Sequence, residues 1–468
     1  MKRCDRVLGV ILCVLLFAGP LSRTSEADSD PTRAARSDKP RIVLFFLDNI
    51  GYGDLGCYGN RAVMTPNINR LAAEGVLCTD FYIGSPSCMP SRGALLTGRH
   101  PVRNGLNQQL IDDLKQVGLP RDEIILPRYL KAAGYVSGCF GKWNIGFLPG
   151  SRPTERGFEE YFGNASGNCD YDTHLYRGRN DLFRGTQPVT VKGYTTFLYA
   201  DAACDFIRRN KERPFFCYVP FNAAHYPSPA NKPPGHPAIW QAPDEYFHIY
   251  GDSPKTLDEP KRYRAVVSAL DAGVGRVLRV LDELGLRDRT LVILLSDNGA
   301  FMMPGRGLEC ASNRPLKGGG VTLWEGGIRV PCLVRWPGRL PSGSICREPL
   351  WSMDFVPMIL KAAGLPLPTD RVLDGRDPTA ALAGQAASPH KALCWQWRAS
   401  SAIRMGRYKL IRERESRDRN WQLFDLEADI GETCNLAAAE PERVEQLKAE
   451  FERWLKEAQA DRQRRKHP

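Results

Sequence analysis

The chain has 468 residues, 43% of them hydrophobic and 25% charged, and 64 Lys and Arg residues against 53 Asp and Glu residues give a net charge of +11. This composition excludes a disordered or fibrous chain, because such chains lack the apolar residues of a packed core. The positive charge is spread along the sequence without a recognition motif, so we expect no nucleic-acid partner.

The first residues have the pattern of a secretory signal peptide. Lys2, Arg3 and Arg6 precede an apolar run over residues 7–19, and a polar stretch follows. The run is shorter than the ~20 residues of a membrane-spanning helix, so we expect no stable membrane insertion, with an uncleaved anchor as the alternative. We predict a signal peptide at 1–27, a linker at 28–39, and export to a periplasmic, secreted or lumenal compartment.

Buried strands alternate with helices in the next part of the chain. Residues 41–47 and 290–295 are apolar runs without alternation, which is typical of parallel strands covered on both faces. Residues 127–133 and 266–284 have the spacing of helices. This alternation predicts an α/β domain over residues 40–340, with a large, mostly parallel sheet sandwiched by helices.

The pattern changes after about residue 340. The stretches 401–410 and 421–426 alternate apolar and polar residues like short antiparallel strands, and 441–455 has the spacing of an amphipathic helix. We therefore predict a smaller C-terminal α+β domain at 341–468, made of an antiparallel sheet and a terminal helix.

Two pairs of polar residues follow predicted strands directly. Asp48 and Asn49 come after the first strand, and Asp297 and Asn298 come after residues 290–295. Ligands of parallel sheets bind where the carboxyl ends of the strands meet, so the two pairs can converge on one site. Their oxygen donors suit a hard cation, Ca²⁺ or Mg²⁺. The alternative for either pair alone is a turn or a helix cap.

The most specific motif is Cys88-Met89-Pro90-Ser91-Arg92, followed by Thr97-Gly98. It resembles the C-x-P-S-R motif of the sulfatase family, whose cysteine is converted after translation into formylglycine; the alternative is a buried or disulfide-bonded Cys88. Further segments look like landmarks of the same family along the chain: Gly51-Tyr52-Gly53-Asp54, Gly141-Lys142-Trp143, His225-Tyr226-Pro227, Asp297-Asn298-Gly299 and Trp324-Glu325-Gly326-Gly327. The resemblance implies an alkaline-phosphatase-like fold.

The resemblance also implies roles for individual residues. A hydrated formylglycine at Cys88 would supply one hydroxyl that attacks sulfur and another that helps to expel sulfate. Arg92 would hold the formylglycine, Lys142 would contact the sulfate, and His225 would protonate the leaving oxygen. The metal ligands would be Asp48, Asn49, Asp297 and Asn298, with Ca²⁺ favoured over Mg²⁺. A formylglycine-generating enzyme would be the partner in maturation.

Three positions depart from the family pattern. Asn49 stands where a second Asp is usual, and this removes one negative charge from the metal site. Asn144 replaces a His that helps to deprotonate the formylglycine hydroxyl, and Gly320 occupies the position of a second sulfate-binding Lys. We predict that Asn144 contacts the substrate, and that Lys317 can reach it from a glycine-rich loop.

The sequence thus predicts an exported sulfatase that hydrolyses a sulfated sugar or an aryl sulfate. The departures support a second hypothesis, a catalytically impaired sulfatase-like protein that binds sulfated glycans. A third is a phosphate or phosphonate ester hydrolase on the same fold. The segments 170–184 and 226–250 are expected to form loops over the pocket.

Overall fold

The computed structural model of the chain describes residues 39–109, 118–227, 231, 239–302, 309–414 and 420–466. These residues belong to one compact unit that begins at Lys39. The predicted signal peptide lies outside the described residues, and so does the predicted linker apart from Lys39. None of the described helices combines the length and the apolar character that a membrane crossing requires.

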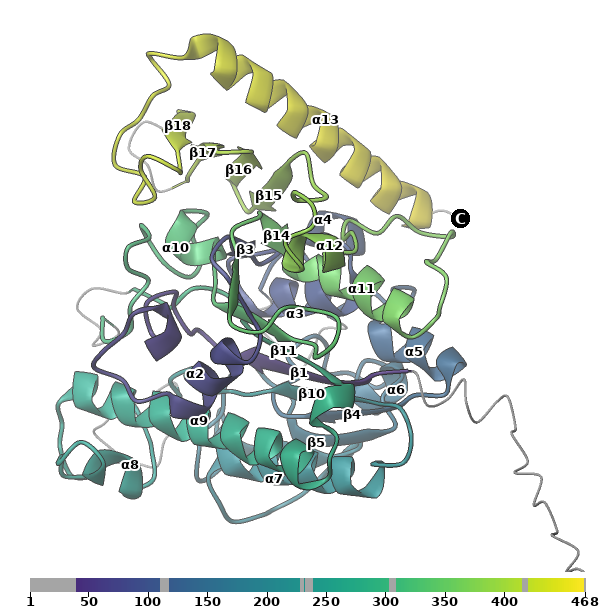
Figure 1. Cartoon of the computed structure of the whole chain (residues 1–468), viewed down its shortest axis with the longest axis vertical. Helices are drawn as coiled ribbons and strands as arrows, with labels where there is room; N and C mark the ends of the chain where they lie inside the picture. The colour runs from purple at the N-terminus through teal and green to yellow at the C-terminus, as the bar shows by residue number, and fades with distance from the viewer. Residues whose placement is uncertain are drawn as a thin grey trace, which may run out of the picture. The chain divides into compact units, whose positions relative to one another are not determined.

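A ten-stranded sheet forms the centre of the fold, in the order β13-β2-β12-β11-β1-β10-β4-β5-β8-β9 (Figure 1). The strands from β11 to β5 run parallel, whereas β12 and β8 are antiparallel to their inner neighbours. The strands are β1 (Arg41–Leu47), β2 (Val76–Cys78), β4 (Val136–Phe140), β5 (Glu160–Asn164), β8 (Leu182–Arg184), β9 (Gln187–Pro188), β10 (Phe215–Pro220), β11 (Thr290–Ser296), β12 (Cys332–Arg335) and β13 (Ser344–Cys346). The predicted fold class, a mostly parallel α/β sheet, is confirmed.

Helices cover both faces of this sheet (Figure 1). The described α-helices are α2 (Pro66–Ala73), α3 (Cys88–Thr97), α4 (Pro101–Asn104), α5 (Leu126–Leu130), α6 (Pro153–Arg156), α7 (Thr195–Arg209), α8 (Glu245–His248), α9 (Glu259–Glu283), α10 (Glu325–Ile328), α11 (Phe355–Ala362), α12 (Thr379–Leu382) and α13 (Pro441–Lys466). Short 3₁₀ turns lie at Gly56–Tyr58, Lys131–Ala133, Arg287–Arg289 and Ser352–Asp354. The helix predicted from residue 266 starts earlier, because Asp258 caps α9 by accepting a hydrogen bond from the Lys261 N–H.

The central strand β1 explains the two-sided core. All of its residues are buried, and successive side chains point to opposite faces of the sheet. Phe46 packs in one cluster with Leu95 of α3, whereas Phe45 packs in the other with Leu270 of α9. A strand covered by helices on both faces needs apolar residues at every position, which is the pattern that the sequence shows.

The C-terminal part contains a separate antiparallel sheet of β15 (Leu393–Trp397), β16 (Ser400–Met405), β17 (Tyr408–Arg412) and β18 (Gln422–Asp425). α13 packs on this sheet through Leu447 and Phe451. The stretch 401–410, which we expected to be regular, spans two strands joined by a turn at Gly406, whose φ is 56°.

Two-residue pairs complete the described strands: β3 (Phe81–Tyr82) with β14 (Leu350–Trp351), and β6 (Leu175–Tyr176) with β7 (Arg179–Asn180). The boundary at residue 340 stays a prediction, since β13 and α11, which follow it, pack with the large sheet.

His100 joins α13 to the large domain and provides a pH-dependent test of this packing. Its ring is fully buried, with its centroid 4.7 Å from that of Trp454 on α13, and its Nδ1 accepts a hydrogen bond from the Val102 N–H at 3.2 Å. Burial lowers the pKa of His100 from 6.5 to about 4. Between these values the unfolded chain binds more protons than the folded protein, so His100 makes the protein less stable as the pH falls.

We therefore expect His100→Asn to destabilise the protein more at pH 7 than at pH 5, because asparagine keeps the acceptor for Val102 but does not titrate. The difference in free energy of unfolding between wild type and variant should shrink by about 2 kcal/mol between pH 7 and pH 5, as measured by urea denaturation. An equal difference at both pH values would contradict this account of His100.

Candidate active site

The polar pairs that follow β1 and β11 meet at one edge of the sheet. β1 and β11 are parallel neighbours, and their last residues, Leu47 and Ser296, are paired in register. The Asn49 N–H donates to Asp297 Oδ1 at 3.1 Å, and Asn298 Nδ2 donates to Asn49 Oδ1 at 2.7 Å. The structure thus brings together oxygen-bearing side chains that lie about 250 positions apart in the sequence.

Cys88 is the first residue of α3 and lies against this strand edge. Its Sγ is 3.7 Å from Asp48 Oδ1 and 3.8 Å from Asn49 Oδ1. The next residue, Met89, is buried in the core and fixes the first turn of the helix. Burial and the charge of Asp297 raise the pKa of the Cys88 thiol well above its usual value. The unmodified thiol therefore stays protonated at neutral pH and is a poor nucleophile.

Two buried cations neutralise the carboxylates of the site. Arg92, one helical turn after Cys88, lies with its Nη2 3.3 Å from Asp48 Oδ2 and 2.8 Å from Asp297 Oδ2. The Lys142 ammonium also pairs with Asp48, and the side chains of both cations are completely buried. Buried charges persist only when they are paired, so this arrangement fixes both cations beside Cys88.

The loop after β10 supplies His225. The Ala224 N–H donates to the Asp48 carbonyl oxygen at 2.7 Å, which ties this loop to the end of β1. His225 Nδ1 lies 2.8 Å from the carbonyl oxygen of Tyr226, which can only accept, so the ring proton is assigned to Nδ1 and Nε2 is left without it in the neutral imidazole. Burial, and then the charge of Lys142, lower the pKa of His225 to about 3.

Asp48, Cys88 and His225 come together at one point of the site, since one ligating atom from each lies within 4.8 Å of the others. Two buried cations, Arg92 and Lys142, lie beside this point, and a bound anion would share them with Asp48 and Asp297. A ring nitrogen without a proton lies beside it and can exchange one. The geometry therefore suits a reaction at an anionic ester.

Comparison with known proteins decides the family. The family model described as Sulfatase matches residues 40–365, which is more than half of the chain. The chain belongs to the sulfatase family. It is therefore a sulfuric ester hydrolase by family. A second model, described as N-sulphoglucosamine sulphohydrolase, C-terminal, matches residues 321–461.

Several relatives of this sulfatase are known. N-acetylgalactosamine-6-sulfatase of Canis lupus familiaris is 35% identical over 406 residues, covering 80% of this chain and 72% of the relative. Steryl-sulfatase of Rattus norvegicus is 33% identical over 423 residues, covering 72% and 69%. The crystal structure of Ps i-CgsB in complex with k-i-k-neocarrahexaose has a TM-score of 0.79 and 31% identity, and the match covers 89% of this chain and 93% of that one.

Asn144, one of the departures from the family pattern, lies two residues after Lys142. Its side chain is completely buried, and neither Nδ2 nor Oδ1 has a hydrogen-bond partner among the residues that the structure describes. An unsatisfied buried amide costs about 1 to 3 kcal/mol, so a polar partner at this position would stabilise the Asn144 side chain. The predicted substrate contact of Asn144 agrees with this state and stays a prediction.

Lys317 points elsewhere. Its Nζ donates to the carbonyl oxygen of Glu432 at 2.9 Å and lies 3.7 Å from the ring centroid of Trp324. These contacts join the glycine-rich loop to the C-terminal part of the chain and give no support to the substrate contact that we predict for Lys317. At Gly320 a side chain would also meet an obstacle, because its Cβ would lie 2.9 Å from the carbonyl oxygen of Gly299.

Two supporting residues were missed from the sequence. Gln109 Oε1 accepts a hydrogen bond from the Met89 N–H at 3.2 Å and so satisfies the first turn of α3. Val321 adopts a φ of 67°, which is strained for a β-branched residue, while its N–H donates to the Pro86 carbonyl oxygen at 2.8 Å. Neither contact has a sequence signal, because each joins segments that are distant in the chain.

The two loops that we expected over the pocket are placed in part. Tyr171, within residues 170–184, donates to the carbonyl oxygen of His225 at 2.8 Å, so the start of this segment lies beside the site. In the segment 226–250, residues 228–230 and 232–238 lie outside the described part. Trp240 of this segment is buried, with its ring centroid 6.0 Å from that of Tyr226.

The strand-edge residues also fit the metal that the family resemblance implies. Carboxylate and amide oxygens of Asp48, Asn49, Asp297 and Asn298 are the donors that hard cations prefer. Asn298 Oδ1 is buried and has no hydrogen-bond partner among the described residues. Burial and the charge of Asp48 raise the pKa of Asp297, a cost that a divalent cation would relieve.

Proposed function

We propose that this sulfatase is exported and hydrolyses sulfate esters of sulfated sugars, using a formylglycine that a formylglycine-generating enzyme makes from Cys88. The observation that carries the proposal is the position of Cys88 at the head of α3, against Asp48 and Asn49. The similarity to N-acetylgalactosamine-6-sulfatase and to Ps i-CgsB with its bound neocarrahexaose supports a sulfated sugar as the substrate class.

The residues around Cys88 have distinct tasks in this proposal. Formylglycine supplies the hydrated aldehyde that reacts at sulfur. Arg92 and Lys142 stabilise negative charge on the sulfate oxygens, because they are fixed in a buried site where little reorganisation is needed. The amide of Asn144 is free to donate a hydrogen bond to an oxygen of the bound ester.

His225 transfers a proton to the leaving oxygen. In the free enzyme the positive charge of Lys142 helps to keep the imidazole neutral. A bound sulfate ester brings negative charge next to Lys142 and His225, so binding raises the pKa of His225 and favours the protonated ring. The Nδ1 contact with the Tyr226 carbonyl oxygen orients the ring, and Nε2 is then the nitrogen that carries the proton to the ester.

Asp48, Asn49, Asp297 and Asn298 would hold a divalent cation, with Ca²⁺ favoured over Mg²⁺. Such an ion offers positive charge to a sulfate oxygen when it is bound. Its binding has a readout that does not depend on activity, because a ligand that binds only the folded state stabilises the protein.

Calcium is expected to stabilise the metal-stripped protein by about 2.7 kcal/mol when the free ion is at 100 times its dissociation constant. Asp297→Asn should lose most of this gain, because it removes a negative charge from the ligand set. Denaturation with and without Ca²⁺, and separately with Mg²⁺, measures the effect within each variant. The control is Asp201→Asn, which removes a surface carboxylate 2.9 Å from Arg276 and should keep the full calcium effect. Equal gains in all proteins would refute the metal site.

The test of the proposed function is co-expression with a formylglycine-generating enzyme. Peptide mass spectrometry establishes the conversion of Cys88. Ion chromatography then measures the sulfate released from sulfated sugars and aryl sulfates, and the phosphate released from aryl phosphates. Sulfate release by the converted protein supports the proposal. Verified conversion without release from any substrate would favour the glycan-binding alternative, and preferential release of phosphate would favour the ester hydrolase of the third hypothesis.

A further inference from the structure

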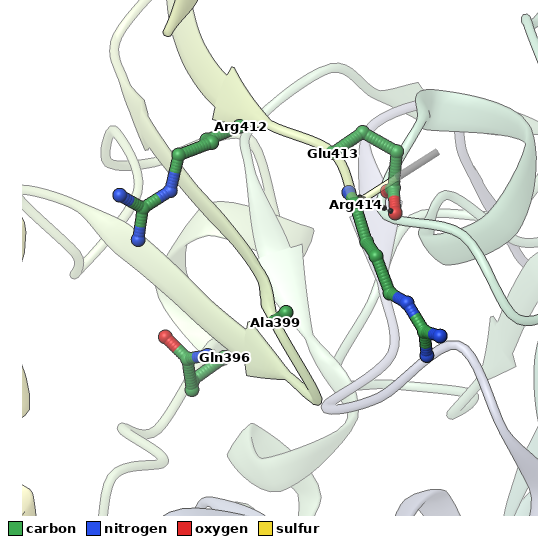
Figure 2. Close-up of a pocket in the computed structure, with 5 residues that line it drawn as sticks. All are labelled: Gln396, Ala399, Arg412, Glu413 and Arg414. Carbon is green, nitrogen blue, oxygen red and sulfur yellow. Dashed lines mark hydrogen bonds between the residues drawn. The ribbon is translucent and has the colours of Figure 1, made fainter. Parts of the chain in front are cut away.

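Two cavities that share Gln396 lie beside the C-terminal sheet, one at the end of β17 and the other between α4 and α13. The first has a volume of about 490 Å³ and is lined by Gln396, Ala399, Arg412, Glu413 and Arg414. Figure 2 shows the side chains of Arg412 and Arg414 extending from the end of β17 to either side of Ala399. The second cavity, of about 440 Å³, also includes Gln396 and continues along α13. We call the two cavities together the C-terminal groove.

The first cavity has a net positive charge. The Glu413 carboxylate is buried and is occupied by donors, since Oε2 accepts the Leu323 N–H at 2.8 Å and Oε1 accepts the hydroxyl of Ser400. Arg412 and Arg414 are both exposed. In the part of the chain that the structure describes, no ion pair joins either of them to a carboxylate. Two guanidinium groups are therefore free to bind an anion with their paired N–H donors.

Other arginines of the same region differ in this respect. Arg407 pairs with Asp425, and Arg453 pairs with Glu450, so these guanidinium groups already have anionic partners. The Arg412 guanidinium instead lies 5.0 Å from the ring centroid of Trp421, a contact that orients it without neutralising its charge.

The second cavity is lined by apolar side chains, Val102 and Leu455, together with polar ones. Asn107, Gln396, Gln459 and Gln463 contribute amides, and Arg462 adds a third guanidinium. Amides offer both donors and acceptors, which matches the hydroxyl groups of sugars. The Gln396 amide already donates to the Arg398 carbonyl oxygen at 2.8 Å and accepts from the Ser401 hydroxyl at 2.9 Å, so Asn107, Gln459 and Gln463 supply the groups for sugar hydroxyls. The groove thus combines groups for anions with groups for hydroxyls.

Two separate connections place the groove close to Cys88. The Glu413 carboxylate accepts a hydrogen bond from the Leu323 N–H. Two residues before Leu323, the Val321 N–H donates to the carbonyl oxygen of Pro86, which lies two residues before Cys88. On the other side, Asn107 of the second cavity is two residues from the Gln109 that caps the first turn of α3. The lengths of these segments limit the distance between the groove and Cys88 to roughly 20 to 25 Å, which is on the scale of a short oligosaccharide.

We propose that the C-terminal groove binds the sugar units next to the one that loses its sulfate, with Arg412 and Arg414 holding a second anionic group of the same chain. The inference rests on the proposed function and deepens it: the preferred substrate is an oligosaccharide with several anionic groups. The second anion is a sulfate or a carboxylate, which share the oxygen geometry that arginine recognises.

The test measures binding without turnover, in a Cys88→Ala background. The probes are a sulfated galactan hexasaccharide, a heparin hexasaccharide and the carboxyl-reduced form of the latter, titrated calorimetrically. The double variant Arg412→Gln/Arg414→Gln should bind about 10- to 100-fold more weakly than its parent. Weakening with the galactan probe assigns the second anion as a sulfate. Weakening with heparin that disappears after carboxyl reduction assigns it as a carboxylate.

The matched control is Arg208→Gln/Arg209→Gln, which makes the same change of charge on exposed arginines of α7 and should keep the dissociation constants within about twofold. If the double variant does not fold, Arg414→Gln alone provides the same test with a smaller expected loss. Unchanged binding of every probe by a folded variant would overturn the proposal. If the double variant binds more weakly but the converted protein with Cys88 intact releases no sulfate from any substrate, the proposed function fails and the groove proposal stands.

Discussion

Replacing Cys88 with alanine is expected to lower kcat/KM for sulfate release by roughly 10⁵- to 10⁶-fold, the scale of loss when an enzyme loses its nucleophile. Alanine has no sulfur to convert into an aldehyde, and no neighbouring group can take its place at the head of α3. The fold should survive, because the hydrogen bonds that the structure describes for the Cys88 thiol are long, 3.7 Å to Asp48 and 3.8 Å to Asn49. Ion chromatography of released sulfate measures the effect.

The control for Cys88→Ala is Cys434→Ala, which removes an exposed cysteine outside the site. This variant should keep the wild-type rate and the same thermal denaturation curve. A Cys88→Ala protein that keeps a tenth of the wild-type activity would show that Cys88 does not provide the reacting group.

His225→Gln is expected to lower kcat for a sugar sulfate by about 10²- to 10⁴-fold, because a sugar alkoxide is a poor leaving group that needs a proton. The same change should reduce turnover of an aryl sulfate with an acidic phenol far less, since that leaving group departs without protonation. Comparing the two substrates in the converted enzyme separates proton transfer from damage to the site, which would slow both equally.

His248→Gln serves as the matched control for His225. His248 lies on α8 and is exposed, so its replacement should leave both substrates at the wild-type rate. If His225→Gln slows both substrates by the same factor, the proton-donor role is wrong, and the residue acts through binding or packing.

Local patterns in the sequence were sufficient to predict the main elements of the fold. Residues 41–47 are apolar at every position because β1 is covered on both faces, and α9 shows helical spacing because one of its sides packs on that sheet. Such patterns indicate which positions are buried, because burial is reflected in the type of residue at each position. They are weaker at turns, so 401–410 seemed continuous although Gly406 divides it into two strands.

The sequence by itself determined the family of this protein, from the segment Cys88 to Arg92 and its accompanying landmarks, and it named the residues at the strand ends. Only the tertiary structure decided how these residues pair. Arg92 contacts Asp297, 205 positions away, because the sheet places β11 beside β1. Lys317 turns toward Glu432 for the same kind of reason. Local sequence determines burial and backbone conformation. Which side chains pair depends on how distant strands and loops are arranged in space, and no local pattern encodes that arrangement.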